Sequence, residues 1–155
     1  MLIVGAKGFA KEVLEIILHE HLSNEIVFFD DLSIDGNKKL YDKYRILRNL
    51  KEASNYFQQI DNRFTLGLGN PIIREQLRER LESAGGILCS SISHLSHIGS
   101  HDVSIGVGVN ILPGAKISNS TFINDNNCQE IKGNFLNQIE GIYEQPTANI
   151  TLNGG

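Results

Sequence analysis

An aliphatic residue recurs at every sixth position between residues 87 and 124, and this rhythm restricts the possible folds more than any other feature. One additional residue lies in the GSHDVS interval (residues 99–104), and small residues fill most positions between. Hexapeptide spacing is typical of a parallel β-helix, in which each six-residue segment forms one side of a coil. Antiparallel strands with chance spacing would rarely keep so many aliphatic residues in register. We therefore predict a short β-helix of about two coils. Its inward column is Ile92, Ile98, Ile105, Ile111, Ile117 and Ile123.

The preceding residues, 1–86, alternate between short apolar segments and amphipathic segments. The apolar segments predict strands of a parallel sheet that is buried on both faces; they are residues 2–6, 25–31 and 63–69, with a shorter one at 41–47. The amphipathic segments predict helices at residues 8–22, 48–60 and 70–86. In the last helix Asn70 is the expected N-cap, and Pro71 occupies the first helical position. This alternation predicts an α/β domain.

The composition of the 155 residues is that of a globular protein, with 41% hydrophobic and 21% charged residues. The net charge is −4 and no block of Lys and Arg occurs, so we expect no nucleic-acid partner. No long apolar run or signal-peptide pattern is present, so we expect a cytoplasmic protein without a membrane span. Cys89 and Cys128 are not part of a CxxC motif, and we predict two reduced thiols.

Three segments carry candidate binding residues. GAKGFAKEV (residues 5–13) places glycines between the first strand and the first helix, where free N–H groups of the helix start favour a phosphate. Asp30 and Asp31 end the second strand, where a carboxylate can accept hydrogen bonds from a ribose or a base. GLGNP (residues 67–71) again places glycines between a strand and a helix. Because these strands are parallel, we expect all three segments at one edge of the sheet. For residues 5–13 the alternative is a tight turn without a ligand, and for Asp30 and Asp31 it is a solvated pair of side chains that ends a strand.

The HLSHIGSH segment has spacing that could suggest a metal site, through His94, His97 and His101. On a β-helix, however, His94 and His97 would point in different directions, and no further ligand completes a set. We therefore predict no metal site. His101 and Asp102 are adjacent, so their side chains would lie on opposite faces of a strand and would not form a catalytic pair.

Several motifs in order resemble one family. VGAKGFAKEVLEII (residues 4–17), VFFDD (27–31) and LGLGNPIIREQL (66–77) are followed directly by the hexapeptide segment 97–124. This combination resembles the sugar O-acyltransferase family related to sialic acid biosynthesis, which includes bacterial UDP-4-amino-sugar N-acetyltransferases. The resemblance implies a small Rossmann-like domain (1–86), a left-handed parallel β-helix (87–124), a homotrimer and acetyl-CoA as acyl donor.

The resemblance also implies roles for particular residues. Lys7, Gly8 and Phe9 would contact the phosphates of a UDP-linked sugar or a related small molecule. Asp30 and Asp31 would hold the uracil and ribose, and Gly69 would line the pocket. Acetyl-CoA would lie along the β-helix between subunits. A histidine of a later coil would remove the proton from the attacking amine or hydroxyl group.

The sequence departs from this family after Asn124. The segment DNNCQEIKG stands where the histidine is expected. When the family pattern is extended past Asn124 without a gap, the position of its histidine falls on Ile131, and no histidine follows His101. We therefore expect no catalytic residue, a truncated β-helix and an inactive chain. The remaining segment, 125–155, has no hexapeptide rhythm. Part of it, IYEQPTANITLNG, resembles a LINE-type reverse transcriptase, so we predict a foreign or disordered tail without polymerase function.

Three functions remain open at this point. The first is an acetyl-CoA-dependent acetyltransferase of a nucleotide-linked amino sugar or sialic acid, and this chain would be an inactive member. The second is a non-catalytic module that binds a UDP-sugar. The third is an NAD-binding Rossmann protein, which the incomplete glycine motif G-x-x-G disfavours.

Overall fold

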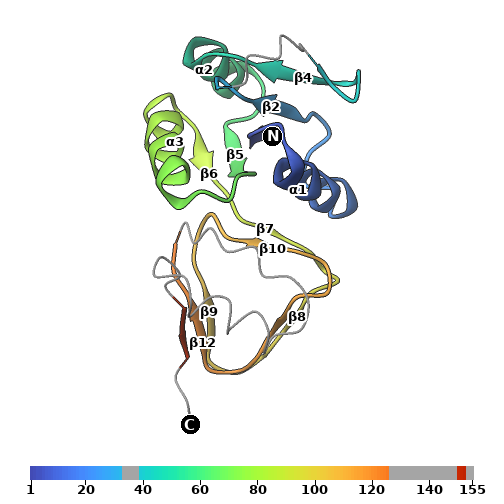
Figure 1. Ribbon diagram of the computed structural model, residues 1–155, viewed down its shortest axis with the longest axis vertical. Coiled ribbons are helices and arrows are strands. Elements are labelled where there is room, and N and C mark those ends of the chain that lie inside the picture. The colour runs from blue at the N-terminus through green and yellow to red at the C-terminus, as the bar shows by residue number, and fades with distance from the viewer. Residues whose placement is uncertain (33–38, 126–149, 153–155) are drawn as a thin grey trace.

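A six-stranded sheet forms the N-terminal half of the protein (Figure 1). The computed structural model describes residues 1–32 and 39–125, together with the backbone of residues 150–152. The strand order is β3-β4-β2-β1-β5-β6, and all neighbouring pairs are parallel except β3 with β4. The strands are β1 (Leu2–Val4), β2 (Val27–Phe29), β3 (Lys39–Leu40), β4 (Tyr44–Leu47), β5 (Arg63–Leu66) and β6 (Ile87–Leu88). The predicted parallel sheet is therefore confirmed.

Helices cover both faces of this sheet, because successive side chains of a strand point in opposite directions. Leu2 and Val4 of β1 pack in the cluster that contains residues of α2 (Leu50–Gln59) and α3 (Pro71–Ser83). Ile3 packs on the other face, in the cluster that contains residues of α1 (Gly8–His19). The continuous apolar sequence of the predicted strands follows from this burial on two sides.

The predicted elements agree with the structure in kind, with two differences. The expected short strand at residues 41–47 is β4, but it is paired with β3 in a hairpin that the sequence pattern did not predict. The i, i+3, i+4 spacing of apolar residues in the first helix (residues 8–22) predicts a buried Leu18, but Leu18 is 37% exposed, whereas Ile16 is buried. Helix α1 contacts β7 as well as the sheet, so the set of residues that it buries differs from that of a helix packed on a sheet alone.

The hexapeptide segment forms three pairs of parallel strands, which follow the three sides of a triangle in Figure 1. The pairs are β7 (Ser91–Ile92) with β10 (Asn110–Ile111), β8 (His97–Ile98) with β11 (Lys116–Ile117), and β9 (Val103–Ile105) with β12 (Thr121–Ile123). In each pair an isoleucine stands opposite an isoleucine: Ile92 and Ile111, Ile98 and Ile117, and Ile105 and Ile123. We call residues 91–123 the coil region.

At a corner of the coil region, a glycine lies in close contact with a residue of the next turn of the chain. The Asp125 carboxylate accepts a hydrogen bond from the Val107 N–H at 2.9 Å. A Cβ added to the neighbouring Gly106 would lie 2.4 Å from that carboxylate oxygen. Glycine is therefore required where one turn of the chain closes over the previous one.

Most of the predicted tail, including Cys128 and Ile131, lies outside the described residues. Of the described residues in this tail, β13 (Ile150–Leu152) pairs antiparallel with β12. Cys89 is a free thiol, and burial raises its pKa. In the part of the chain that the structure describes, no helix has the length and hydropathy needed to cross a membrane.

Candidate functional site

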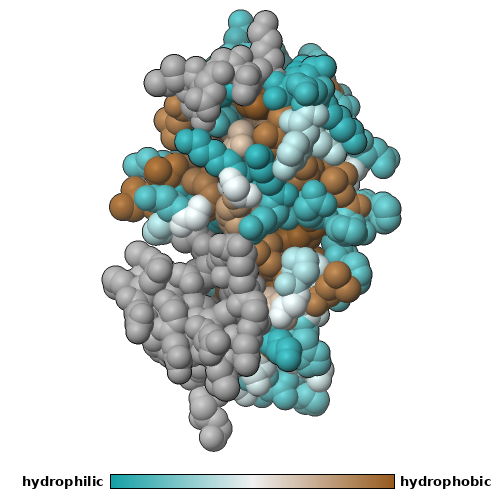
Figure 2. Space-filling model, turned by 45° about the vertical axis from the view of Figure 1, so that its right-hand side comes forward, coloured by the Kyte–Doolittle hydropathy of each residue, from teal (hydrophilic) through white to brown (hydrophobic). Residues whose placement is uncertain are grey.

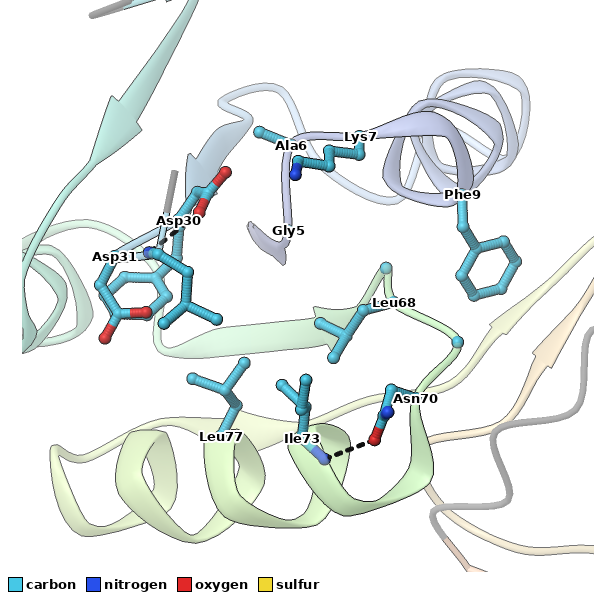
Figure 3. Close-up of a pocket in the computed structure, with 14 residues that line it drawn as sticks. Gly5, Ala6, Lys7, Phe9, Asp30, Asp31, Leu68, Asn70, Ile73 and Leu77 are labelled. Carbon is cyan, nitrogen blue, oxygen red and sulfur yellow. Dashed lines mark hydrogen bonds between the residues drawn. The ribbon is translucent and has the colours of Figure 1, made fainter. Parts of the chain in front are cut away.

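A cavity of about 330 Å³ lies at the carboxyl ends of the central strands (Figure 3). Strand β1 stands between β2 and β5, so the chain continues to one side of β1 first and to the other side later. Loops diverge at such a switch point, and ligands of open α/β sheets bind there. The lining residues are Gly5, Ala6, Lys7, Phe9, Phe29, Asp30, Asp31, Leu32, Gly67, Leu68, Gly69, Asn70, Ile73 and Leu77.

One side of the cavity is apolar. Leu68 lies in the loop after β5, and Ile73 and Leu77 face the cavity from α3 (Figure 3). Asn70 holds the start of this helix, because its side chain accepts a hydrogen bond from the Ile73 N–H at 3.1 Å. The predicted N-cap is thus confirmed, and the apolar side provides a surface on which a flat ring can lie.

Two carboxylates form the end of the cavity next to β2. Asp30 is 9% exposed, and its Oδ1 accepts a hydrogen bond from the Leu32 N–H at 3.1 Å. The Asp31 carboxylate pairs with Arg80 of α3, with 2.6 Å between Oδ2 and Nη2. Arg48 donates to the Asp30 carbonyl oxygen at 2.9 Å, so both main chain and side chains are held in place here. This end offers hydrogen-bond acceptors to hydroxyl and N–H groups of a ligand.

The start of α1 forms a third part of the cavity. Its N-cap is Lys7, whose side chain makes no capping hydrogen bond. In contrast, Asn49 caps α2 and Asn70 caps α3. Main-chain N–H groups and the partial positive charge of the helix therefore remain available to an anion, and the Lys7 ammonium group adds positive charge.

Two glycines allow the loops around the cavity to approach each other. Gly5 has a φ of +94°, and an added Cβ would lie 2.9 Å from the Gly67 carbonyl oxygen. A Cβ on Gly67 would lie 2.7 Å from the Ala10 Cα, so α1 could not pack against the end of β5. Gly5 and Gly67 are therefore the positions where a close approach excludes a side chain.

The structure brings together five of the six predicted binding residues: Lys7, Phe9, Asp30, Asp31 and Gly69 all line the cavity. Gly8 does not line it, and a Cβ there would meet nothing within 4 Å. The roles that the family resemblance implies for these residues stay predictions. The sequence analysis did not identify the apolar residues Leu68, Ile73 and Leu77 as part of the site. Ile73 and Leu77 lie four positions apart on α3, a spacing that ordinary core residues also have.

None of the three histidines considered for a metal lines this cavity. The His94 N–H donates to Glu20 Oε1 at 2.7 Å, and His94 Nδ1 lies 2.6 Å from the same oxygen. These hydrogen bonds hold the pKa of Glu20 below its ordinary value. Over residues 1–32 and 39–125, no group of three or more His, Cys, Asp or Glu side chains could hold a metal ion.

Residues 1–81 match the PglD N-terminal domain family. The chain belongs to this family. Because the match covers strands β1 to β5, helices α1 and α2 and most of α3, it includes every residue that lines the cavity. No curated protein sequence matches the chain.

Solved structures share the fold. A point mutant of perosamine N-acetyltransferase from Caulobacter crescentus, in complex with CoA and GDP-perosamine, has a TM-score of 0.67 at 20% identity. The acetyltransferase domain of PglB from Neisseria gonorrhoeae FA1090 has a TM-score of 0.68 at 22% identity. The same domain in complex with acetyl coenzyme A has a TM-score of 0.67 at 22% identity. The family match confirms the predicted family relationship, and the neighbours show that the chain shares the fold of these acetyltransferases.

The likeness has limits in length. It covers 81% of this chain in all three cases, so it extends beyond the segment matched by the family. The chain spans 57% of the Caulobacter protein and 58% of the Neisseria domain.

Proposed function

We propose that the cavity binds the nucleotide-linked amino sugar that an acetyl-CoA-dependent N-acetyltransferase uses as acceptor. The observation that carries the proposal is the joint position of an uncapped helix start, two carboxylates and an apolar wall in one cavity. Neighbours of the same fold are solved with CoA and GDP-perosamine, or with acetyl coenzyme A. The ligands of these neighbours agree with an acceptor of this class.

The three parts of the cavity suit three parts of such a ligand. A base would lie against Leu68, Ile73 and Leu77, and the carboxylates of Asp30 and Asp31 would accept hydrogen bonds from base or ribose. The diphosphate would lie at the start of α1, next to Lys7. Uracil and guanine both suit this arrangement, because each carries an N–H group that can donate a hydrogen bond to a carboxylate.

We further infer that the coil region is the beginning of a left-handed parallel β-helix, and that residues 1–86 and 87–124 are the two domains. Leu95, Val107 and Phe122 of this region are exposed hydrophobic residues, which suits a trimer with acetyl-CoA between subunits. On the face seen in Figure 2, hydrophobic areas stand among hydrophilic ones over the described residues.

In the transfer reaction, the amine of the sugar attacks the thioester carbonyl, the CoA thiol leaves, and a base takes the proton of the amine. No described histidine lines the cavity, and no histidine follows His101 in the sequence. We therefore propose that these 155 residues bind the acceptor without transferring the acetyl group.

Calorimetric titration tests the binding proposal. We expect the chain to bind UDP or GDP, and to bind NAD⁺ more weakly. Asp30→Asn keeps the Oδ1 acceptor for the Leu32 N–H but removes the charge, and should lower the affinity about tenfold, or about 1.4 kcal/mol. Asp42→Asn, on the exposed turn between β3 and β4, is the matched control and should leave the affinity unchanged. Preference for NAD⁺, or equal affinities for both variants, would contradict the proposal.

A further inference from the structure

Arg74 is a fully buried cation between the sheet and the coil region. Its side chain is 0% exposed, although it lies on α3, a helix whose other arginines reach the surface. Its Nη1 donates to the carbonyl oxygens of Leu66 (2.8 Å) and Leu68 (2.9 Å), and its Nη2 donates to that of Gly108 (2.9 Å). One guanidinium group therefore joins the end of β5, the cavity wall and a corner of the coil region.

The position of Arg74 in its own helix does not explain this arrangement. It follows Pro71, the first residue of α3, by three positions, so its charge lies in the first turn, where the helix dipole disfavours a cation. Burial of the charge carries a further penalty, and an apolar residue of similar volume is often at least as stabilising. The hydrogen bonds to three carbonyl oxygens reduce these penalties.

The carbonyl groups that Arg74 contacts belong to segments with little freedom to move. A Cβ on Gly108 would lie 2.5 Å from the Leu88 side chain, so this corner packs tightly against β6. The Leu66 carbonyl oxygen also accepts a hydrogen bond from the Asn110 side chain at 2.6 Å. Leu68 and Gly69, in the loop that follows Leu66, line the cavity. The coil region therefore contacts the segment that forms this wall of the cavity.

We propose that Arg74 is a positioning residue that joins the cavity wall at Leu68 and Gly69 to the coil region, so that the two segments are ordered together. One consequence rests on the proposed function: a ligand that binds in the cavity also orders the segment around Gly108. The planar guanidinium group spans three acceptors, which the single ammonium group of lysine does not.

Residue-resolved hydrogen exchange without ligand tests the link directly. The Gly67 N–H donates to the Val4 carbonyl oxygen and the Val109 N–H donates to Ser90 Oγ, and both report on the joined segments. In Arg74→Met we expect both amides to exchange about tenfold faster or more, because buried carbonyl groups lose their donors. The Val27 N–H of β2 should exchange as in the unchanged protein, which excludes a general loss of stability.

Two further variants serve as controls. Arg78→Met removes an arginine of the same helix that pairs with Glu75 and Glu82, and should leave both amides unchanged. Arg74→Lys should give the same pattern as Arg74→Met with smaller changes, and it replaces that variant if the latter does not fold. Faster exchange at only one of the two amides, or equal acceleration at Val27, would overturn the proposal.

Measurements with ligand distinguish a failure of this inference from a failure of the proposed function. If the unchanged protein binds UDP or GDP, Arg74→Met should bind it about tenfold more weakly, and ligand should no longer slow exchange at Val109. Unchanged affinity in Arg74→Met would overturn the positioning role. Failure of the unchanged protein to bind either nucleotide would reject the proposed function, while the exchange data without ligand would still decide whether Arg74 joins the two segments.

Discussion

At the scale of single residues, the cavity depends on backbone positions where a side chain has no room. Gly5 and Gly67 lie at the ends of neighbouring strands, and each would place an added Cβ against main-chain atoms of another segment. Gly8 and Gly69, in the same loops, have open space around them. Glycines in one motif therefore have different roles, and only their surroundings distinguish them.

This difference leads to a stability prediction. Gly67→Ala should reduce the free energy of unfolding by about 1–3 kcal/mol, because its Cβ would lie 2.7 Å from the Ala10 Cα and 3.0 Å from the Val4 carbonyl oxygen. Gly69→Ala is the control and should stay within about 0.5 kcal/mol of the unchanged protein. Urea unfolding measures both. Equal unfolding midpoints for the two variants would show that α1 can shift to accept the methyl group.

At the scale of elements, α1 differs from the other helices at its start. Asn49 and Asn70 cap their helices through side-chain oxygens, but Lys7 occupies the equivalent position of α1 without a capping hydrogen bond. Its backbone is extended, with φ −103° and ψ −165°, as an N-cap requires. The helix thus lacks a stabilising feature at the place where we propose that phosphate binds.

A substitution can restore this cap at the expense of binding. Lys7→Asp should raise the free energy of unfolding by about 1 kcal/mol, because the carboxylate can accept N–H groups of the first turn. The same carboxylate would repel a phosphate, so affinity for UDP or GDP should fall about tenfold or more. Unfolding and calorimetry are measured on one preparation. Asn49→Asp keeps a cap on α2 and should not change binding; loss of binding there as well would argue against a local effect.

At the scale of the whole molecule, the sheet and the coil region meet through several polar contacts. Besides Arg74, the Asn110 side chain donates to the Leu66 carbonyl oxygen, and Glu20 at the end of α1 accepts two contacts from His94. Because α1 begins at the cavity and ends next to the coil region, this helix connects the two.

The contact between Glu20 and His94 predicts a pH dependence. The pKa of Glu20 is lowered by the His94 main-chain N–H and then by its ring, so its ionised form stabilises the folded state. This contribution is present above the ordinary pKa of a glutamate and is lost as the pH falls through the lowered value. Glu20→Gln should therefore unfold at a lower temperature than the unchanged protein at pH 7, and at the same temperature near pH 2.

Thermal unfolding at several pH values measures this effect, and Glu15→Gln serves as the control. Glu15 is exposed on the same helix, so its substitution should leave the pH profile unchanged. A constant difference between Glu20→Gln and the unchanged protein at every pH would assign the contact to packing and not to charge.

Patterns within the sequence were sufficient to predict whether most elements are helices or strands, and to predict most of the polar residues and glycines that line the cavity. Apolar segments buried on both faces indicated parallel strands, and the Asn70-Pro71 pair marked the start of α3. Lys7, Phe9, Asp30, Asp31 and Gly69 follow or flank strands whose carboxyl ends meet at one edge, so their proximity follows from a parallel sheet alone. Local spacing determines these features, because it sets which side of an element is apolar and where each element ends.

Only the tertiary structure decided which side chains become buried between elements. Arg74 belongs to a charged, amphipathic helix and gives no local sign of full burial; the carbonyl groups it contacts come from residues 66, 68 and 108. Leu68, Ile73 and Leu77 are likewise apolar residues that a sequence pattern places in a core, yet they line a cavity. The physical reason is the same in each case: burial depends on neighbours that are distant in the sequence, and local periodicity contains no information about them.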